Sequence, residues 1–139
     1  MTIVKTNTYN SLQLKEEQYS QVSSEFKIIE ALKQENCFGF YAYDGEIRVG
    51  FALLKEFAKN QFFLWDFIID CKYQSRGKGK EFLQLLICVL SNEYSAKVIT
   101  TTYVYGNTVA KNLYEKFGFI QTDVVNENDI HEVNMKLFL

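Results

Sequence analysis

The most informative part of the chain runs Phe62-Phe63-Leu64-Trp65-Asp66-Phe67-Ile68-Ile69-Asp70 and, two residues later, Tyr73-Gln74-Ser75-Arg76-Gly77-Lys78-Gly79-Lys80. The first run is almost wholly apolar, which is typical of a strand covered on both faces of a sheet. The second run leads into a helical pattern. Its two glycines let the backbone approach a ligand closely and direct unpaired N–H groups at it.

The charges of this loop point to a bound anion. Arg76, Lys78 and Lys80 lie where the dipole of the following helix is positive, and an exposed cation there costs about 0.3–1 kcal/mol of stability. A bound polyanion would reverse that cost, whereas a solvated basic turn, the alternative interpretation, would not. We therefore predict an anion-binding loop over residues 74–80.

Two common nucleotide-binding motifs do not fit the loop. The dinucleotide fingerprint G-x-G-x-x-G would require glycine at position 82, where the chain has Phe82. The mononucleotide loop G-x-x-x-x-G-K-[ST] would require Ser or Thr after Gly79-Lys80, where the chain has Glu81, and glycine at position 74. Neither class of nucleotide site is expected.

The flanking segments predict one α/β domain over residues 1–139. Apolar runs around an Asp44-Gly45 turn predict a hairpin over 38–54, and the order strand, helix, strand over 62–104 implies a right-handed parallel crossover. We expect a mixed sheet of about six or seven strands, mostly antiparallel with one central parallel pair, flanked by about four helices. The other expected elements are a short N-terminal strand, one or two helices within 11–35, helices over 79–92 and from 107 to Gly118, and strands over 97–104, 118–125 and 130–138.

Composition excludes several kinds of partner. The 139 residues carry 15 basic and 17 acidic side chains, so no broad basic face is expected to bind nucleic acid or an anionic membrane.

Three cysteines without C-x-x-C spacing and a single histidine, His131, do not make a zinc motif, and we predict no metal. The cysteines are interpreted as reduced thiols, with a Cys–His nucleophile pair as the alternative. The N-terminus lacks a secretory pattern, so a cytoplasmic protein is expected.

Two motifs in a fixed order carry a family resemblance. The first is Gln74-x-x-Gly77-x-Gly79, which opens a helix after an apolar strand. The second is Asn107-x-x-Ala110-x-x-Leu113-Tyr114-x-x-Phe117-Gly118-Phe119. Together they resemble the GCN5-related N-acetyltransferase (GNAT) superfamily over residues 37–139. Within it, residues 64–70 with Tyr73-Gln74 are similar to bacterial spermidine/spermine (diamine) N-acetyltransferases.

This resemblance implies acetyl-CoA as the acetyl donor, bound where two central parallel strands splay apart. The pyrophosphate would lie on backbone N–H groups at the helix start, and the pantetheine arm would pair with the backbone of Phe67, Ile68 and Ile69. Asn107 would help to hold the pantetheine arm or the far end of the cofactor, although a helix N-cap is an equally good role for it. The implied cofactor-binding residues of the loop are Gln74, Ser75, Arg76, Gly77, Lys78, Gly79 and Lys80.

Two residues are candidates for catalysis. The resemblance implies Tyr114 as the general acid, because a phenol with a reference pKa of about 10 stays protonated at neutral pH and can protonate a departing thiolate. Its alternative role is that of one more aromatic on an apolar helix face. Asp66 interrupts an apolar strand and, on an ideal strand, shares a face with Leu64 and Ile68. A buried carboxylate needs a partner, either a cationic amine substrate or a structural cation such as Arg48.

The predicted function is transfer of an acetyl group from acetyl-CoA to a primary amine, with a polyamine as the best single candidate. One alternative is a protein or peptide amine acetyltransferase. Another is a non-catalytic acyl-CoA-binding regulatory domain, which would need no acid at Tyr114. A small-molecule amine partner is expected, and a homodimer is left open. The residues expected around the acceptor are Glu56, Tyr41 and Tyr43 on neighbouring strands, and an N-terminal segment that carries Glu16, Glu17 and Glu25.

Overall fold

The computed structural model describes residues 1–139 and contains a seven-stranded mixed sheet with the strand order β1-β2-β3-β4-β5-β7-β6. Neighbouring strands are antiparallel except β4 and β5, which are parallel and joined by a helix, as the sequence predicted. The strands are β1 (Thr2–Thr6), β2 (Cys37–Asp44), β3 (Ile47–Ala58), β4 (Gln61–Ile69), β5 (Val98–Val104), β6 (Ile120–Glu127) and β7 (Ile130–Phe138).

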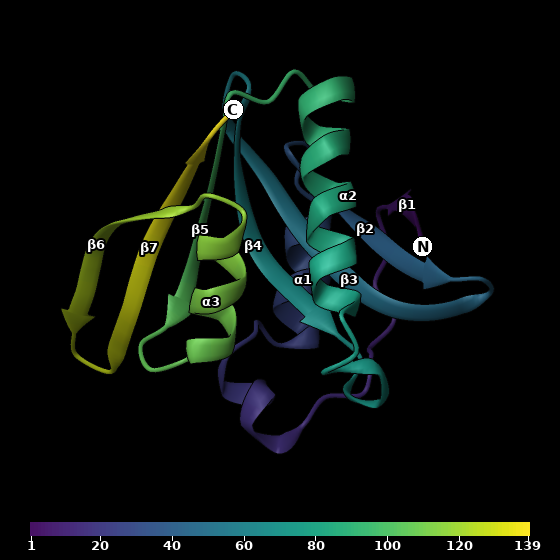
Figure 1. Ribbon diagram of the computed structural model, residues 1–139, viewed down its shortest axis with the longest axis horizontal. Coiled ribbons are helices and arrows are strands. Elements are labelled where there is room, and N and C mark those ends of the chain that lie inside the picture. Colours follow the sequence, from purple (N-terminus) through teal and green to yellow (C-terminus); the bar gives the residue numbers. More distant parts are fainter.

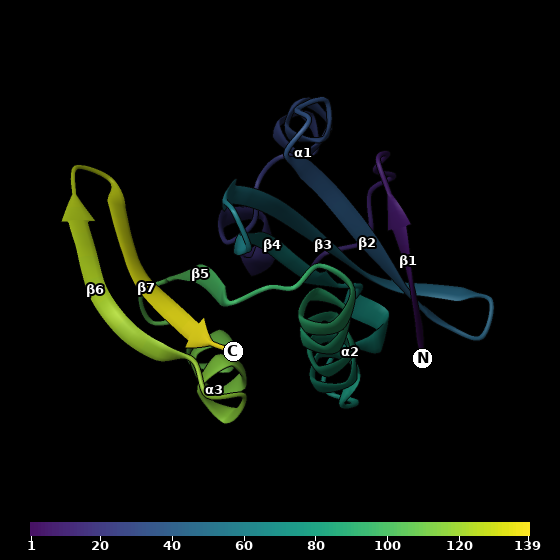
Figure 2. The same cartoon turned by 90° about the horizontal axis from the view of Figure 1, so that it is seen from above.

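Three α-helices pack on the sheet, one on one face and two on the other (Figures 1 and 2). α1 (Glu25–Leu32) lies on the first face, and α2 (Lys78–Glu93) and α3 (Thr108–Lys116) lie on the second. Two short 3-10 helices, η1 (Glu16–Ser20) and η2 (Cys71–Tyr73), precede α1 and α2 respectively. The sheet is thus covered on both faces near β4, the strand on which the site was predicted.

The number of helices is slightly lower than the predicted four. The difference lies within residues 11–35, where η1 is a single turn and α1 begins only after Ser24, whose Oγ accepts a hydrogen bond from a backbone N–H of its first turn. Upstream of Ser24, backbone groups bond to a distant loop instead: the Cys71 N–H donates to the Gln13 C=O at 2.8 Å. A backbone group that is already bonded elsewhere cannot join a helical ladder.

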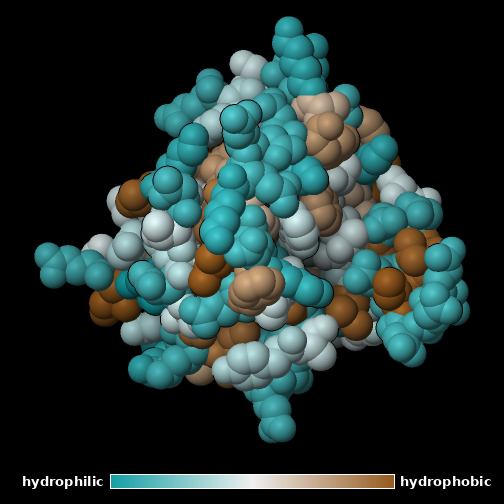
Figure 3. Space-filling view, turned by 180° about the vertical axis from the view of Figure 1, so that it is seen from behind, coloured by the Kyte–Doolittle hydropathy of each residue, from teal (hydrophilic) through white to brown (hydrophobic).

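The sheet separates two hydrophobic cores. The larger lies under α2 and α3 and includes the fully buried Phe82, and the smaller lies under α1 and includes Ile28. β4 contributes to both cores, with Leu64 in the larger and Ile68 in the smaller. Seen from the α1 side, the surface is mostly polar, and apolar residues form small separate groups (Figure 3). Packing on both faces therefore holds β4 in place.

A β-bulge in β4 changes the direction of its side chains. Two successive residues of β3 pair with Leu64 and Asp66, so Trp65 is an extra residue on β4. The expectation that Asp66 shares a face with both Leu64 and Ile68 is therefore wrong in part. Leu64 packs under α2, whereas Ile68 packs under α1, because the extra residue reverses the alternation. Asp66 faces the α1 side, together with Ile68.

β4 and β5 pair along only part of their length. Their register runs from Gln61 opposite Val98 to Leu64 opposite Thr101, and beyond this point the strands diverge (Figure 1). The backbone groups on the facing edges have no sheet partner there. The splayed parallel pair that the resemblance implied is present.

Candidate active site

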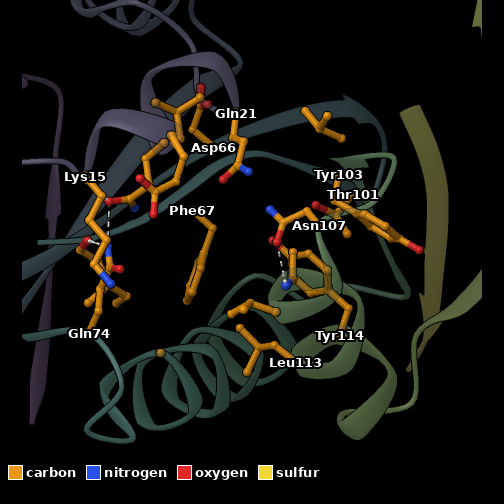
Figure 4. Close-up of a pocket in the computed structure, with 18 of the residues that line it drawn as sticks. Lys15, Gln21, Asp66, Phe67, Gln74, Thr101, Tyr103, Asn107, Leu113 and Tyr114 are labelled. Carbon is orange, nitrogen blue, oxygen red and sulfur yellow. Dashed lines mark hydrogen bonds between the residues drawn. The ribbon is translucent and has the colours of Figure 1, made fainter. Parts of the chain in front are cut away.

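A cavity of about 510 Å³ occupies the space between the diverging ends of β4 and β5. It is lined by both strands, the start of α2, one face of α3, and residues 15–22, here called the strap (Figure 4). All the predicted donor-site and catalytic residues line it except Ile68 and Arg76. Those that line it are Asp66, Phe67, Ile69, Gln74, Ser75, Gly77, Lys78, Gly79, Lys80, Asn107 and Tyr114.

The glycines shape the donor end of the cavity. Gly77 is the N-cap of α2 and has a φ of 77°, a left-handed conformation that favours glycine. A Cβ on Gly79 would lie 3.7 Å from Ile69 Cγ1 and 3.8 Å from Leu113 Cδ2, two side chains that line the cavity. A side chain at position 79 would therefore occupy the cavity floor. The bare backbone at the start of α2 fits a diphosphate held by N–H groups.

The three cations of the loop have different surroundings. Lys78 Nζ lies 2.7 Å from Asp44 Oδ2 at the tip of the β2–β3 hairpin, and this pair raises the pKa of Lys78 and lowers that of Asp44. Arg76 and Lys80 are exposed and have no acidic partner, and of these two Lys80 lines the cavity whereas Arg76 does not. Lys80 is thus the loop cation best placed to meet a bound anion.

The backbone groups of Phe67 and Ile69 lie on the edge of β4 that faces the cavity. The Asp70 N–H donates to the Val49 C=O of the β3 side, and backbone groups alternate along an antiparallel strand. The backbone of Ile68 therefore points to β3, and those of Phe67 and Ile69 point to the open edge. Ile68 is also fully buried under α1, which explains why it does not line the cavity. A pantetheine arm would find its strand-like partners in Phe67 and Ile69.

Tyr114 lies across the cavity from β4. Figure 4 shows Asp66 and Phe67 on one side and Asn107, Thr101 and Tyr114 on the other. Burial raises the pKa of the Tyr114 phenol to about 12, an effect that the neighbouring Thr101 hydroxyl reduces and that Asp66 increases. The phenol is therefore protonated at any working pH, as a proton donor must be.

Asn107 is the N-cap of α3. Its Oδ1 accepts a hydrogen bond from the Ala110 N–H at 3.1 Å, which confirms the capping role. The rest of its amide is directed into the cavity (Figure 4). The Nδ2 donor is thus left for a ligand.

Asp66 is almost wholly buried and only partly satisfied. It is 5% exposed, its Oδ1 accepts from the Ser23 N–H at 2.8 Å, and its Oδ2 has no partner. Burial raises the pKa of Asp66, and the bond from Ser23 offsets part of that rise. No Lys or Arg forms an ion pair with it, and Arg48 instead lies over the Tyr41 ring, 4.9 Å from its centroid. Arg48 is therefore not the partner of Asp66.

Most of the residues that the sequence placed around the acceptor amine lie away from the cavity. Tyr41, Tyr43 and Glu56 do not line the cavity. The Tyr41 hydroxyl donates to the Thr8 C=O and is buried under α1, and a Glu56 carboxylate oxygen accepts from a backbone N–H of the β3–β4 turn. Of the three acidic N-terminal residues, only Glu17 lines the cavity.

Several residues on β5 and on the strap line the cavity although the sequence did not predict them. Thr101 and Tyr103 occupy inward positions of β5, and the Thr101 hydroxyl donates to the Leu64 C=O at 3.0 Å. The alternation of β5 was a usable signal for both. Gln18 and Gln21 of the strap also line the cavity, and no periodic pattern marks them.

Comparison with known proteins agrees with this geometry. The acetyltransferase (GNAT) family matches residues 6–119. A spermine/spermidine N(1)-acetyltransferase of Bacillus subtilis strain 168 is 32% identical over 118 residues, which cover 78% of this chain and 76% of that protein. The chain belongs to the acetyltransferase (GNAT) family.

Solved structures share the fold at low sequence identity. A GNAT family acetyltransferase from Elizabethkingia anophelis with acetyl-CoA bound has a TM-score of 0.73 at 17% identity, covering 99% of this chain and 98% of that one. The ribosomal-protein-S18-alanine N-acetyltransferase of Escherichia coli has a TM-score of 0.74 at 17% identity, covering 99% and 94%.

The protein is an N-acetyltransferase that uses acetyl-CoA, as the sequence predicted. None of its helices has the length and apolar character needed to cross a bilayer.

Proposed function

We propose that the acceptor is a small cationic alkyl amine, with a polyamine as the best single candidate, and that Asp66 binds it. The observation that carries this proposal is that Asp66 lines the cavity while its buried Oδ2 has no hydrogen-bond partner. A buried carboxylate oxygen left unpaired is costly, and a substrate cation would satisfy it. The Bacillus subtilis relative, whose name specifies spermine and spermidine, supports the same class.

The proposed chemistry divides between two residues. An alkyl amine with a pKa of about 10.4 arrives protonated, and Asp66 would attract it and accept or relay its proton, which frees the nitrogen lone pair. Because burial raises the pKa of Asp66, its carboxylate is a stronger base than an exposed aspartate. Acetyl-CoA supplies the acetyl group when bound. The freed amine nitrogen would form a bond to the acetyl carbon, and Tyr114 would donate its phenolic proton to the sulfur as the C–S bond breaks. The proton that the nitrogen loses on becoming an amide would pass to solvent, and solvent would restore the Tyr114 hydroxyl.

The donor residues remain part of the proposal. Backbone N–H groups of residues 74–80 would hold the diphosphate, Phe67 and Ile69 would pair with the pantetheine arm, and Asn107 Nδ2 would donate to it. Their common place on the cavity wall supports this assignment.

Protein or peptide acetylation is the second candidate, because the Escherichia coli enzyme with the same fold is named for a ribosomal protein. The strap lines the cavity next to Ser23 and Asp66, which favours a small amine over a polypeptide. A purely regulatory acyl-CoA-binding domain would have no use for a buried proton donor at Tyr114.

A panel of amines tests the proposal. Spermine, spermidine, short diamines, a peptide with an N-terminal alanine and a lysine peptide would each be incubated with acetyl-CoA, with products identified by mass. An enzyme-only blank is needed in thiol assays because the chain has three free cysteines. We expect acetylated polyamine. Acetylation of the peptides alone would contradict the polyamine assignment.

The cytoplasm is the proposed location, supported by the free cysteines. A homodimer remains a prediction, which light scattering of the purified protein would test.

A further inference from the structure

We propose that Gln18 and Gln74 form a hydrogen-bonded link through which the donor loop positions the strap for the acceptor, an inference that rests on the proposed function of the cavity. Gln74 Nε2 donates to Gln18 Oε1 at 2.6 Å and to the Ile69 C=O at 2.9 Å. Gln18 Oε1 also accepts from the Lys15 N–H at 2.7 Å. Two side chains 56 positions apart thus join the end of β4, the donor loop and the strap.

Backbone partners fix the orientation of both amides. The Ile69 C=O can only accept a hydrogen bond, so Gln74 must present its NH2 group to it. The Lys15 N–H can only donate, so Gln18 must present its oxygen. The contact between the two glutamines is therefore directional: Gln74 donates and Gln18 accepts.

The same strand and loop hold the chain on either side of the strap. Before it, the Gln13 N–H donates to Asp70 Oδ2 at 3.2 Å, and the Gln13 C=O accepts from the Cys71 N–H at 2.8 Å. After it, the Ser23 N–H donates to Asp66 Oδ1 at 2.8 Å. The strap contains only one turn of 3-10 helix and no buried residue in that turn, so these contacts decide its position.

A ligand that orders the donor loop should therefore also order the strap. Occupation of the loop by acetyl-CoA would restrict Gln74, and Gln74 would restrict Gln18 and the strap residues that face the amine. Because coupling between two binding sites is reciprocal, the amine should strengthen acetyl-CoA binding by the same factor. Gln18 is a positioning residue in this scheme.

Four variants separate a directional link from simple packing. Gln18→Ala removes the acceptor, so the KM for spermidine should rise about five- to tenfold while the Kd for acetyl-CoA stays within about twofold. Gln18→Glu keeps an oxygen that can accept from both the Lys15 N–H and Gln74 Nε2. Its KM for spermidine should therefore be no higher than that of the native protein. Gln74→Glu replaces the donating Nε2 with an oxygen, which can donate neither to Gln18 Oε1 nor to the Ile69 C=O. It should therefore raise the KM for spermidine as Gln18→Ala does. Gln84→Ala, at an exposed position of α2, is the control.

Hydrogen exchange of residues 11–24, with and without acetyl-CoA, provides a readout that needs no acceptor. We expect acetyl-CoA to slow exchange in the native protein, in Gln18→Glu and in Gln84→Ala, but not in Gln18→Ala or Gln74→Glu. A native KM and a native exchange response in Gln18→Ala would overturn the link, as would equal effects of Gln18→Glu and Gln18→Ala. If the native protein acetylates no amine in the panel, the proposed function fails, whereas the exchange experiment still decides the link.

Discussion

Tyr114 is a phenol buried in a cavity wall, and burial raises its pKa to about 12. Tyr114→Phe keeps the ring and removes the proton, so stability should change little and turnover should fall roughly 10²-fold or more. Because the raised pKa keeps the phenol protonated up to about pH 12, the substitution should not remove any limb of the pH–rate profile below about pH 10. Turnover near the native value, with chemistry rate-limiting, would assign the acid elsewhere.

The Asp66 carboxylate should support activity while it lowers the stability of the folded protein at neutral pH. Its pKa is raised in the folded state, so stability is full below the unfolded pKa of about 3.9 and falls as pH rises through the folded pKa. Asp66→Asn keeps the acceptor for Ser23 and removes the charge. At pH 7 it should therefore match or exceed native stability, by up to about 1–3 kcal/mol, and this difference should vanish near pH 4.

Urea unfolding at the two pH values measures this effect, and acceptor kinetics provide the second readout. Asp66→Asn should raise the KM for the amine or lower kcat/KM while leaving acetyl-CoA affinity nearly unchanged. An equal loss of stability at both pH values, without an acceptor effect, would mean that Asp66 is a structural residue.

Chemistry at single positions was largely readable from the sequence. Asp66 stood out because a carboxylate interrupts an apolar run, and the structure buries it as that pattern predicted; the partner that a buried carboxylate needs is absent at Oδ2. Asn107 has the predicted capping role and also lies in the cavity wall, so the cap does not prevent the proposed contact with the cofactor. Gln18 could not be predicted, because its partner lies 56 positions away and amide pairs leave no periodic signal.

The start of α2 is the element on which donor binding depends. Gly79→Val should weaken acetyl-CoA binding by well over about tenfold with the fold intact, because its side chain would enter the cavity floor that a bound ligand needs. Gln84→Val places the same residue on an exposed position of the same helix and should leave affinity unchanged.

Calorimetric titration of both folded variants with acetyl-CoA gives the comparison. Native affinity in Gly79→Val would exclude the loop as the donor site. A similar loss in Gln84→Val would attribute the effect to the stability of α2 rather than to the cavity.

Periodicity predicted most elements because their apolar faces pack against one sheet. It failed at two places. The extra residue at Trp65 reverses the alternation of β4, and nothing in the local sequence shows that two β3 residues pair around it. Residues 11–24 lack a long helix because Gln13 and Ser23 bond to Asp70 and Asp66, contacts that only the folded chain creates.

At the scale of the whole molecule, ligand binding should appear as thermal stability. Acetyl-CoA at about 100 times its Kd adds about 2.7 kcal/mol to the free energy of unfolding, which for a domain of this size raises Tm by roughly 8–13 °C. Scanning fluorimetry over a range of acetyl-CoA concentrations measures the shift. Gly79→Val is the matched control and should lose most of it, and an unchanged Tm in the native protein would contradict donor binding.

The bulge at Trp65 also determines which face of the sheet each neighbouring β4 side chain meets. Asp66 faces the α1 side of the sheet, whereas Phe67 packs on Phe82 of α2, with ring centroids 4.9 Å apart, on the opposite side. The cavity between β4 and β5 is thus lined from both faces of the sheet, by the strap on one side and by α2 and α3 on the other. A donor held at the start of α2 and an amine held at Asp66 would thus lie towards opposite faces of the sheet, so the two substrates would not compete for the same space.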